Sequence, residues 1–218
     1  MKVFVCLAYF CALGATAGRG QTTPAAWPTA DGTYTIRSFQ FKDGETIDAL
    51  RLHYLTLGRA HRDAAGHVDN AVLLLHGTGG DAHSLLNPLF SNVLFVPGGV
   101  LDITKYFVIL PGDIGHGQSS KPSDGLHMRF PQYDYDDMVR SQHLMLTDGL
   151  HVDHLRLILG TSMGCMQSFV WGGDVSRVCA GAGAVCVLAG RVGWPQQNDA
   201  IYGDPSDQTG PGVDEWGV

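Results

Sequence analysis

Basic residues are scarce in this sequence. Its 14 lysines and arginines are outnumbered by 21 aspartates and glutamates, which gives a formal net charge of −7, and only 16% of the 218 residues are charged. Because binding to a phosphate backbone requires a basic face, we expect no nucleic-acid partner. Apolar residues reach 44%, a proportion typical of a globular chain rather than a disordered one.

Cysteine is also sparse and unevenly placed. Cys6 and Cys11 lie near the N-terminus, and only Cys165, Cys179 and Cys186 follow. An odd, irregular set does not make a disulfide framework, and no Cys/His spacing matches a zinc site. The sequence therefore predicts neither a metal site nor a cofactor.

The N-terminal apolar run is too short to cross a bilayer, which takes about 20 residues, and we expect no membrane span. This run, Val3 to Gly14, follows Lys2 and precedes an Ala-Thr-Ala at residues 15–17. A charged start, a short apolar core and an A-x-A site are typical of a secretory signal peptide; a buried first strand or helix is the alternative. We expect a signal peptide at residues 1–17 and an exported protein, periplasmic or secreted.

The rest of the chain alternates between strand and helix patterns after a linker at residues 18–32, which is rich in Gly, Thr, Ala and Pro. Two strand-like runs, 34–41 and 50–57, flank an Asp-Gly turn signal. Residues 135–149 have helical spacing of apolar side chains. Three continuous apolar runs predict strands buried on both faces of a parallel sheet: 71–75, 106–110 and 155–159. This alternation predicts an α/β fold with a doubly wound, mostly parallel sheet.

The strongest chemical signal is GTSMG at residues 160–164, between a predicted buried strand and a helical pattern. A G-x-S-x-G in that context is typical of a nucleophile elbow, whose sharp turn pushes the serine hydroxyl out above the sheet. The helix dipole at such a turn favours a developing anion. A chance match in a chain with 29 glycines is the alternative. We expect Ser162 to be the nucleophile.

A second glycine-rich segment, HGTGG at residues 76–80, follows the strand predicted at 71–75. Acyl transfer needs two backbone N–H donors aimed at the oxyanion, one from the residue after the nucleophile and one from a loop after an earlier strand. The pattern predicts an oxyanion hole formed by Met163 and Thr78; an ordinary glycine-rich turn is the alternative. We interpret His76 as a brace for this loop rather than as a base.

A third segment, PGDIGHGQSS at residues 111–120, follows the strand predicted at 106–110. Its Asp113 and His116 have the chemistry of triad members. Where a serine stands on this kind of elbow, however, the acid and the histidine follow it in the chain. We therefore interpret the segment as a structural loop near the site.

Together these segments resemble the homoserine O-acetyltransferase-like branch of the α/β-hydrolases, over residues 33–172. The resemblance implies an α/β-hydrolase fold with Ser162 as the nucleophile and with Thr78 and Met163 as the oxyanion donors. The segments that carry it are LLLHGTGG at 73–80, GHGQSSKPSDGL at 115–126, YDDMV at 135–139, GTSMGCM at 160–166 and WG at 171–172.

Three further positions bear on this resemblance. Arg140 fits a helical position where such proteins often carry an arginine. Cys165 stands where the family usually has a second glycine after the nucleophile. Gly112-Asp113 inverts the family's usual Asp-Gly.

The triad cannot be completed in the expected order, because no histidine follows His154. The resemblance ends at Gly172, and residues 173–218 hold nine glycines and no lysine. We expect this tail to be disordered, and the sheet to lack its C-terminal strands, which leaves the strand at 155–159 at an open edge. One hypothesis is a frameshift near codon 173, because a shift by one base can encode Ala-Thr-Tyr-Pro-Glu-Phe, which suits the family.

These observations predict a serine-nucleophile acyl-transfer enzyme that acts on a small-molecule ester or acyl substrate. An exported ester hydrolase is favoured, because the acyl-CoA donor of an acetyltransferase is cytosolic. The alternatives are a homoserine O-acetyltransferase-like acyltransferase and a non-catalytic remnant of the fold. Because no histidine follows Ser162 and no acid after it can be assigned to the triad, we expect the 218-residue chain itself to have little or no turnover.

Overall fold

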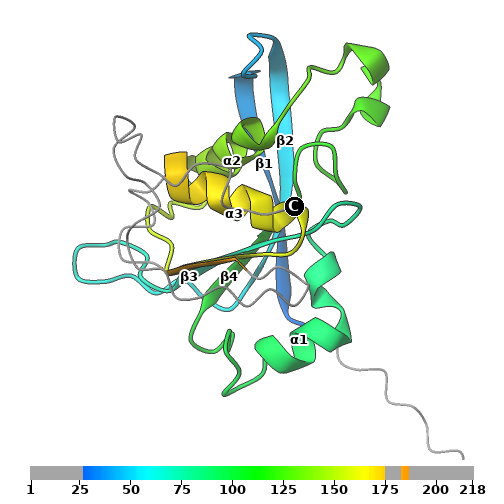
Figure 1. Cartoon of the computed structure of the whole chain (residues 1–218). Helices are drawn as coiled ribbons and strands as arrows, with labels where there is room; N and C mark the ends of the chain where they lie inside the picture. The colour runs from blue at the N-terminus through cyan, green and yellow to red at the C-terminus, as the bar shows by residue number, and fades with distance from the viewer. Residues whose placement is uncertain (1–26, 175–182, 187–218) are drawn as a thin grey trace, which may run out of the picture.

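The computed structural model describes residues 27–174 and 183–186 (Figure 1). The predicted signal peptide and most of the predicted linker and tail lie outside these residues. The described part contains one six-stranded sheet with the strand order β1-β2-β4-β3-β5-β6. Its strands are β1 (Thr29–Gln40), β2 (Thr46–Leu57), β3 (Ala71–Leu75), β4 (Phe107–Pro111), β5 (Leu157–Gly160) and β6 (Gly183–Cys186).

Helical segments connect the strands on either side of the sheet. The α-helices are α1 (Pro88–Leu94), α2 (Tyr135–Leu144) and α3 (Met163–Asp174), and α2 continues into the π-helical turn η4 (Met145–Gly149). Short 3-10 turns are η1 (Ser84–Leu86), η2 (Pro122–Asp124) and η3 (His127–Arg129). The predicted helix at 135–149 is therefore confirmed as α2 plus η4.

The first two strands form an antiparallel hairpin, and β2 also pairs antiparallel with β4. Gly44 makes the turn with φ +95°, a conformation that costs glycine little. β1 begins inside the predicted linker, where Gly32 pairs with Tyr54. A Cβ at Gly32 would lie 2.7 Å from Cε2 of that tyrosine ring. The glycine that looked like a linker signal instead makes room for a neighbouring ring.

Strands β4, β3, β5 and β6 form the parallel part of the sheet. Side chains of β3 are buried on both faces, as the continuous apolar run predicts. Leu73, Ile109 and Ile158 belong to one core, together with residues of α2 and α3. Val72, Leu74 and Val108 belong to a second core, which packs against α1. Figure 1 shows α2 and α3 on one side of the sheet and α1 on the other, which confirms the doubly wound architecture.

The first turn of α2 is closed by a capping box. The Asp134 side chain accepts hydrogen bonds from the backbone N–H groups of Asp136 and Asp137, and the Asp137 side chain accepts from the Asp134 N–H. Carboxylates at this end of a helix also interact favourably with its dipole. The cap fixes where α2 begins and so which of its side chains face α3.

The expectation that β5 lies at an open edge is wrong. β6 pairs with it in parallel, with Leu157 opposite Gly183 and Gly160 opposite Cys186. The sequence around β6 has no alternating pattern, but a strand in the parallel part of a sheet needs none. A run of small residues is compatible with backbone pairing, and periodicity gave no signal for it.

The described residues contain no helix long and apolar enough to cross a membrane. The same residues hold no cluster of three or more His, Cys, Asp or Glu side chains that could bind a metal ion. Cys165 is disulfide-bonded. The odd cysteine count argues against a framework of several bridges and cannot reveal a single one.

Candidate active site

Ser162 occupies the turn between β5 and α3. Its φ is +51°, a left-handed conformation that costs a non-glycine residue about 1–2 kcal/mol. The turn is closed by hydrogen bonds from Gly164 N to Thr161 O at 2.9 Å and from Cys165 N to Ser162 O at 2.9 Å. The Ser162 side chain is exposed. This strained, outward-facing serine between a strand and a helix is the geometry of a nucleophile elbow.

Glycines at both ends of the elbow allow the backbone segments to approach closely. A Cβ at Gly160 would lie 2.6 Å from the Cys165 nitrogen and still nearer to the Gly164 carbonyl. A Cβ at Gly164 would lie 2.7 Å from the Leu75 Cβ. Real Cβ atoms do not come so close to backbone atoms, so the positions of the two glycines follow from the geometry of the turn.

The loop after β3 lies directly against the elbow. Thr161 N donates to Leu75 O at 3.1 Å, and a Cβ at Gly77 would lie 3.3 Å from the Ser162 Cβ. The loop turns back on itself through a hydrogen bond from Gly80 N to Gly77 O at 3.0 Å. Segments far apart in the sequence are thus brought side by side at Ser162.

Both predicted oxyanion donors lie at this junction. Thr78 is exposed in the loop after β3, and Met163 is the first residue of α3. Within residues 27–174 and 183–186, neither backbone N–H has a hydrogen-bond partner. The first N–H groups of a helix have no intrahelical acceptor, so the Met163 N–H is available to an anion. The structure thus places the predicted donors beside the predicted nucleophile.

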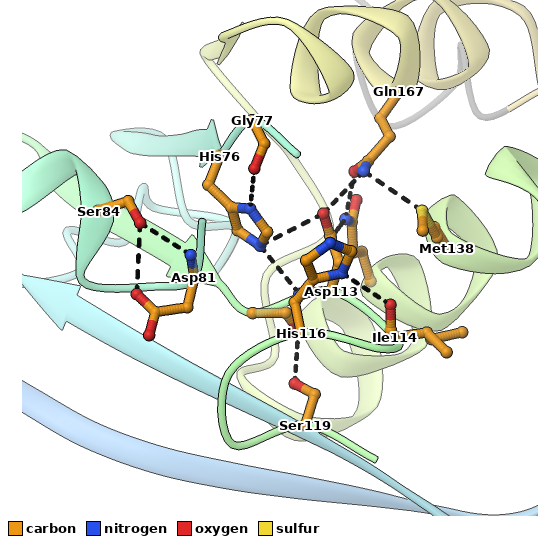
Figure 2. Close-up of polar contacts among 12 residues, drawn as sticks. His76, Gly77, Asp81, Ser84, Asp113, Ile114, His116, Ser119, Met138 and Gln167 are labelled. Atoms are coloured by element: carbon orange, nitrogen blue, oxygen red, sulfur yellow. Dashed lines mark hydrogen bonds and ion pairs between the residues drawn. The ribbon is translucent and has the colours of Figure 1, made fainter. Parts of the chain in front are cut away.

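The His76 side chain contacts both its own loop, after β3, and the loop after β4 (Figure 2). Its Nδ1 lies 2.9 Å from Gly77 O, and the Asp113 backbone N–H donates to its Nε2 at 3.2 Å. The ring is 1% exposed. Nε2 also lies 3.4 Å from Asp113 Oδ2. Both ring nitrogens are therefore engaged with neighbouring groups inside the protein, as expected of a bracing histidine.

The Asp113 carboxylate is buried in a network of amide side chains. Gln142 Nε2 donates to its Oδ1, and Gln167 Nε2 donates to its Oδ2 at 2.7 Å. Gln142 Nε2 also donates to Gln167 Oε1 at 2.7 Å, and Trp171 Nε1 donates to Gln142 Oε1 at 2.8 Å. Burial, and secondly the charge of Asp113, raise the pKa of Tyr133. The predicted structural loop is thus joined to α2 and α3.

Two other residues singled out in the sequence have structural contacts. His116 Nδ1 lies 3.0 Å from Ile114 O, and its ring lies edge-on to His76 at a centroid distance of 5.2 Å. Arg140 stacks its guanidinium over the Phe39 ring at 4.4 Å and donates to the Gln40 carbonyl. Arg140 therefore ties α2 to β1, with no contact to the elbow among the described residues.

A family model described as the alpha/beta hydrolase fold matches residues 70–206. The chain belongs to the α/β-hydrolase fold family. The match includes the elbow and both segments that meet at Ser162, so family membership rests on the part of the chain that forms the site.

Relatives of this α/β-hydrolase agree with the predicted branch. A "Probable acyltransferase" of Methanothermobacter thermautotrophicus is 34% identical over 142 residues, which cover 65% of this chain and 43% of the relative. A "Homoserine O-acetyltransferase" of Thermobifida fusca is 31% identical over 196 residues, which cover 78% of this chain and half of the relative. The chain thus spans half or less of the length of these relatives.

A solved acetylester hydrolase from Corynebacterium glutamicum has the same fold, with a TM-score of 0.56 and 24% identity. That likeness covers 66% of this chain and 40% of the solved one. At this identity the likeness bears on the fold alone.

The match to the fold-family model runs to residue 206, beyond Gly172. That model describes the α/β-hydrolase fold as a whole, so the expectation that the resemblance to the homoserine O-acetyltransferase-like branch ends at Gly172 stays a prediction. The frameshift near codon 173 stays a prediction.

The site of this α/β-hydrolase brings together the predicted nucleophile and the two predicted donors, with no assigned base. In the described part of the chain, the Ser162 hydroxyl has no hydrogen-bond partner. Sequence reasoning missed Gln142 and Gln167, which lie beneath the site. A signal for both existed, because each is a polar residue at a core-facing position of a helix, where buried polar groups require partners.

Proposed function

We propose that Ser162 is the nucleophile of an acyl-transfer reaction on a small-molecule ester, with the acyl oxyanion held by Thr78 N–H and Met163 N–H. The observation that carries this proposal is the elbow itself: a serine at φ +51° with two backbone donors beside it that have no partner in the described residues. Donors fixed in advance at the position of a developing charge are a major source of catalysis.

In this reaction the Ser162 Oγ attacks the acyl carbonyl carbon, and the carbonyl oxygen becomes the oxyanion. Collapse of the tetrahedral species expels the alcohol and leaves the acyl group on Oγ. A second nucleophile, water or an alcohol, then releases the acyl group. Both steps need a base to accept a proton, and no histidine follows Ser162 in the 218 residues. We therefore expect little turnover from these residues alone.

We favour water as the second nucleophile and an exported hydrolase as the whole protein. The signal-like N-terminus supports export. The disulfide at Cys165 adds independent support, because disulfides persist in oxidising compartments. The relatives named for acyltransfer favour the second candidate, in which an alcohol such as homoserine accepts the acyl group.

The two candidates differ in where the acetyl group goes. The test supplies p-nitrophenyl acetate with imidazole as an external base, with and without L-homoserine, and measures acetate and O-acetylhomoserine. For a hydrolase we expect acetate in both cases, above the amount that imidazole alone releases, and we expect this excess to be lost in Ser162→Ala. Formation of O-acetylhomoserine that depends on Ser162 would favour the acyltransferase. Equal product from the unmutated chain and Ser162→Ala would support the non-catalytic remnant instead.

A further inference from the structure

One buried carboxylate contacts both sides of the oxyanion site. Asp113, on the loop after β4, is 1% exposed. Its backbone N–H donates to His76 Nε2, and its carboxylate accepts from Gln167 Nε2. Figure 2 shows Asp113 between His76 on one side and Gln167 on the other. His76 belongs to the segment that carries Thr78, and Gln167 belongs to the helix that begins at Met163.

The side that carries Thr78 is held through one tautomer of His76. The Asp113 N–H can only donate to Nε2, and Gly77 O can only accept from Nδ1, so both contacts are satisfied when the ring proton is on Nδ1. Nε2 also lies 3.4 Å from Asp113 Oδ2. The Nδ1–H group then donates to Gly77 O at 2.9 Å. Gly77 in turn packs against the elbow, where a Cβ would lie 3.3 Å from the Ser162 Cβ. The position of Asp113 thus fixes the loop against the nucleophile.

The side that carries Met163 is held through a network with only one consistent set of donors. The indole N–H of Trp171 can only donate, so its partner on Gln142 is the amide oxygen. The Gln142 NH₂ group must then donate to Asp113 and to Gln167 Oε1. This leaves the Gln167 NH₂ group to donate to the other Asp113 oxygen. Both carboxylate oxygens of Asp113 therefore accept from amide NH₂ groups.

We propose that Asp113 is the positioning residue of the oxyanion hole: it holds the Thr78 loop, through His76, and α3, through Gln167, at one fixed separation. The inference rests on the proposed function, because it assigns Asp113 a purpose in that site. Oxyanion donors act only when both lie about 2.7–3.1 Å from the developing charge. The two donors come from segments far apart in the sequence, so a group that contacts both segments is needed to fix their separation. Asp113 is such a group, because it contacts His76 on one segment and Gln167 on the other.

The test uses substitutions that move the carboxylate from position 113 to position 167. In Asp113→Asn one of the two accepting oxygens becomes an NH₂ group, which faces the NH₂ group of Gln142 or of Gln167, donor against donor. In Gln167→Glu two carboxylates face each other. The double variant Asp113→Asn/Gln167→Glu restores one donor and one acceptor across the same gap. Asp102→Asn is the matched control, since Asp102 is also a buried carboxylate but accepts from Gly98 and Thr104, outside the network.

Two NMR readouts do not depend on catalysis. Hydrogen exchange at the Gly80 N–H reports closure of the loop, because that group donates to Gly77 O. The ¹⁵N signals of the His76 ring report which nitrogen is protonated. An unsatisfied buried polar group costs about 1–3 kcal/mol, so we expect each single variant to exchange about tenfold faster or more at Gly80 and to perturb the ring signals. The double variant should return close to the unmutated chain, and Asp102→Asn should leave both readouts unchanged.

Imidazole-supported hydrolysis of p-nitrophenyl acetate provides the functional readout. Each single variant should lower kcat with KM unchanged, and the double variant should recover kcat. Wild-type exchange and ring signals in both single variants, or a double variant no better than either single one, would overturn the inference. If the unmutated chain shows no hydrolysis that depends on Ser162, the proposed function fails. The exchange and ring signals still decide whether Asp113 holds the loop.

Discussion

Gly160→Ala tests the elbow geometry most sharply. The added Cβ would lie 2.6 Å from the Cys165 nitrogen and nearer still to the Gly164 carbonyl. A relaxed contact of this kind needs about 3.5 Å, so the first turn of α3 must move by roughly 1 Å. The obstructing atoms are backbone atoms, which cannot rotate away as a side chain would. The substitution therefore forces apart the turn that holds Ser162.

The expected cost follows from this overlap. Overpacking destabilises by about 1–3 kcal/mol, occasionally more, and a backbone obstruction belongs at the upper end. About 3 kcal/mol corresponds to roughly a hundredfold change in the folding equilibrium. Gly172→Ala is the matched control, because it lies in α3 with no atom within 4 Å of the added Cβ. Relief of the glycine penalty should make that variant more stable by up to about 1 kcal/mol.

Urea unfolding followed by circular dichroism measures both variants. We expect Gly160→Ala to have a clearly lower midpoint than the unmutated chain and Gly172→Ala to have an equal or higher one. If the two variants differ by less than about 1 kcal/mol, α3 does not abut the end of β5 as described, and the elbow geometry is wrong.

Three further predictions concern the hydrogen-bond network around Asp113, the loss of stability at acid pH and the N-terminus. Trp171→Phe removes the donor to Gln142 Oε1 and should destabilise by about 1–3 kcal/mol in urea unfolding; an unchanged midpoint would refute the network. Hydrogen bonds from Thr104 and Gly98 lower the pKa of Asp102 from 3.8 to about 2. The stability that Asp102 contributes is therefore present above its unfolded pKa and lost as pH falls towards 2. Asp102→Asn should flatten the fall of Tm over that range, and an unchanged slope would contradict the assignment. Export predicts that Edman sequencing of the mature protein begins near Gly18; an intact Met1 would exclude cleavage.

The elbow could be predicted because its determinants are local. Glycines two residues either side of Ser162 and a buried strand before it specify one tight turn. Chain order also removed Asp113 from the triad, and the structure places it in a bracing network. The contacts of Asp113 could not be predicted, because Gln142 and Gln167 lie on different helices. Only the packing of α2 against α3 brings them together.

β6 shows a different limit of sequence reasoning. Its pairing with β5 depends on backbone hydrogen bonds, which require no periodic pattern of side chains. β1 began earlier than its apolar pattern indicated because Gly32 lies against the Tyr54 ring. In β1 a small residue that looked like a linker signal makes room for close packing.

The central claim is that Ser162 is a nucleophile that lacks only a base within these 218 residues. The most direct test is hydrolysis of p-nitrophenyl acetate by the unmutated chain and by Ser162→Ala, each with and without imidazole. The account predicts equal rates without imidazole and a larger imidazole-dependent increase in the unmutated chain. An equal increase in both proteins would contradict the role of Ser162. Turnover without imidazole that Ser162→Ala abolishes would show instead that a histidine given a structural role here, His76 or His116, acts as the base.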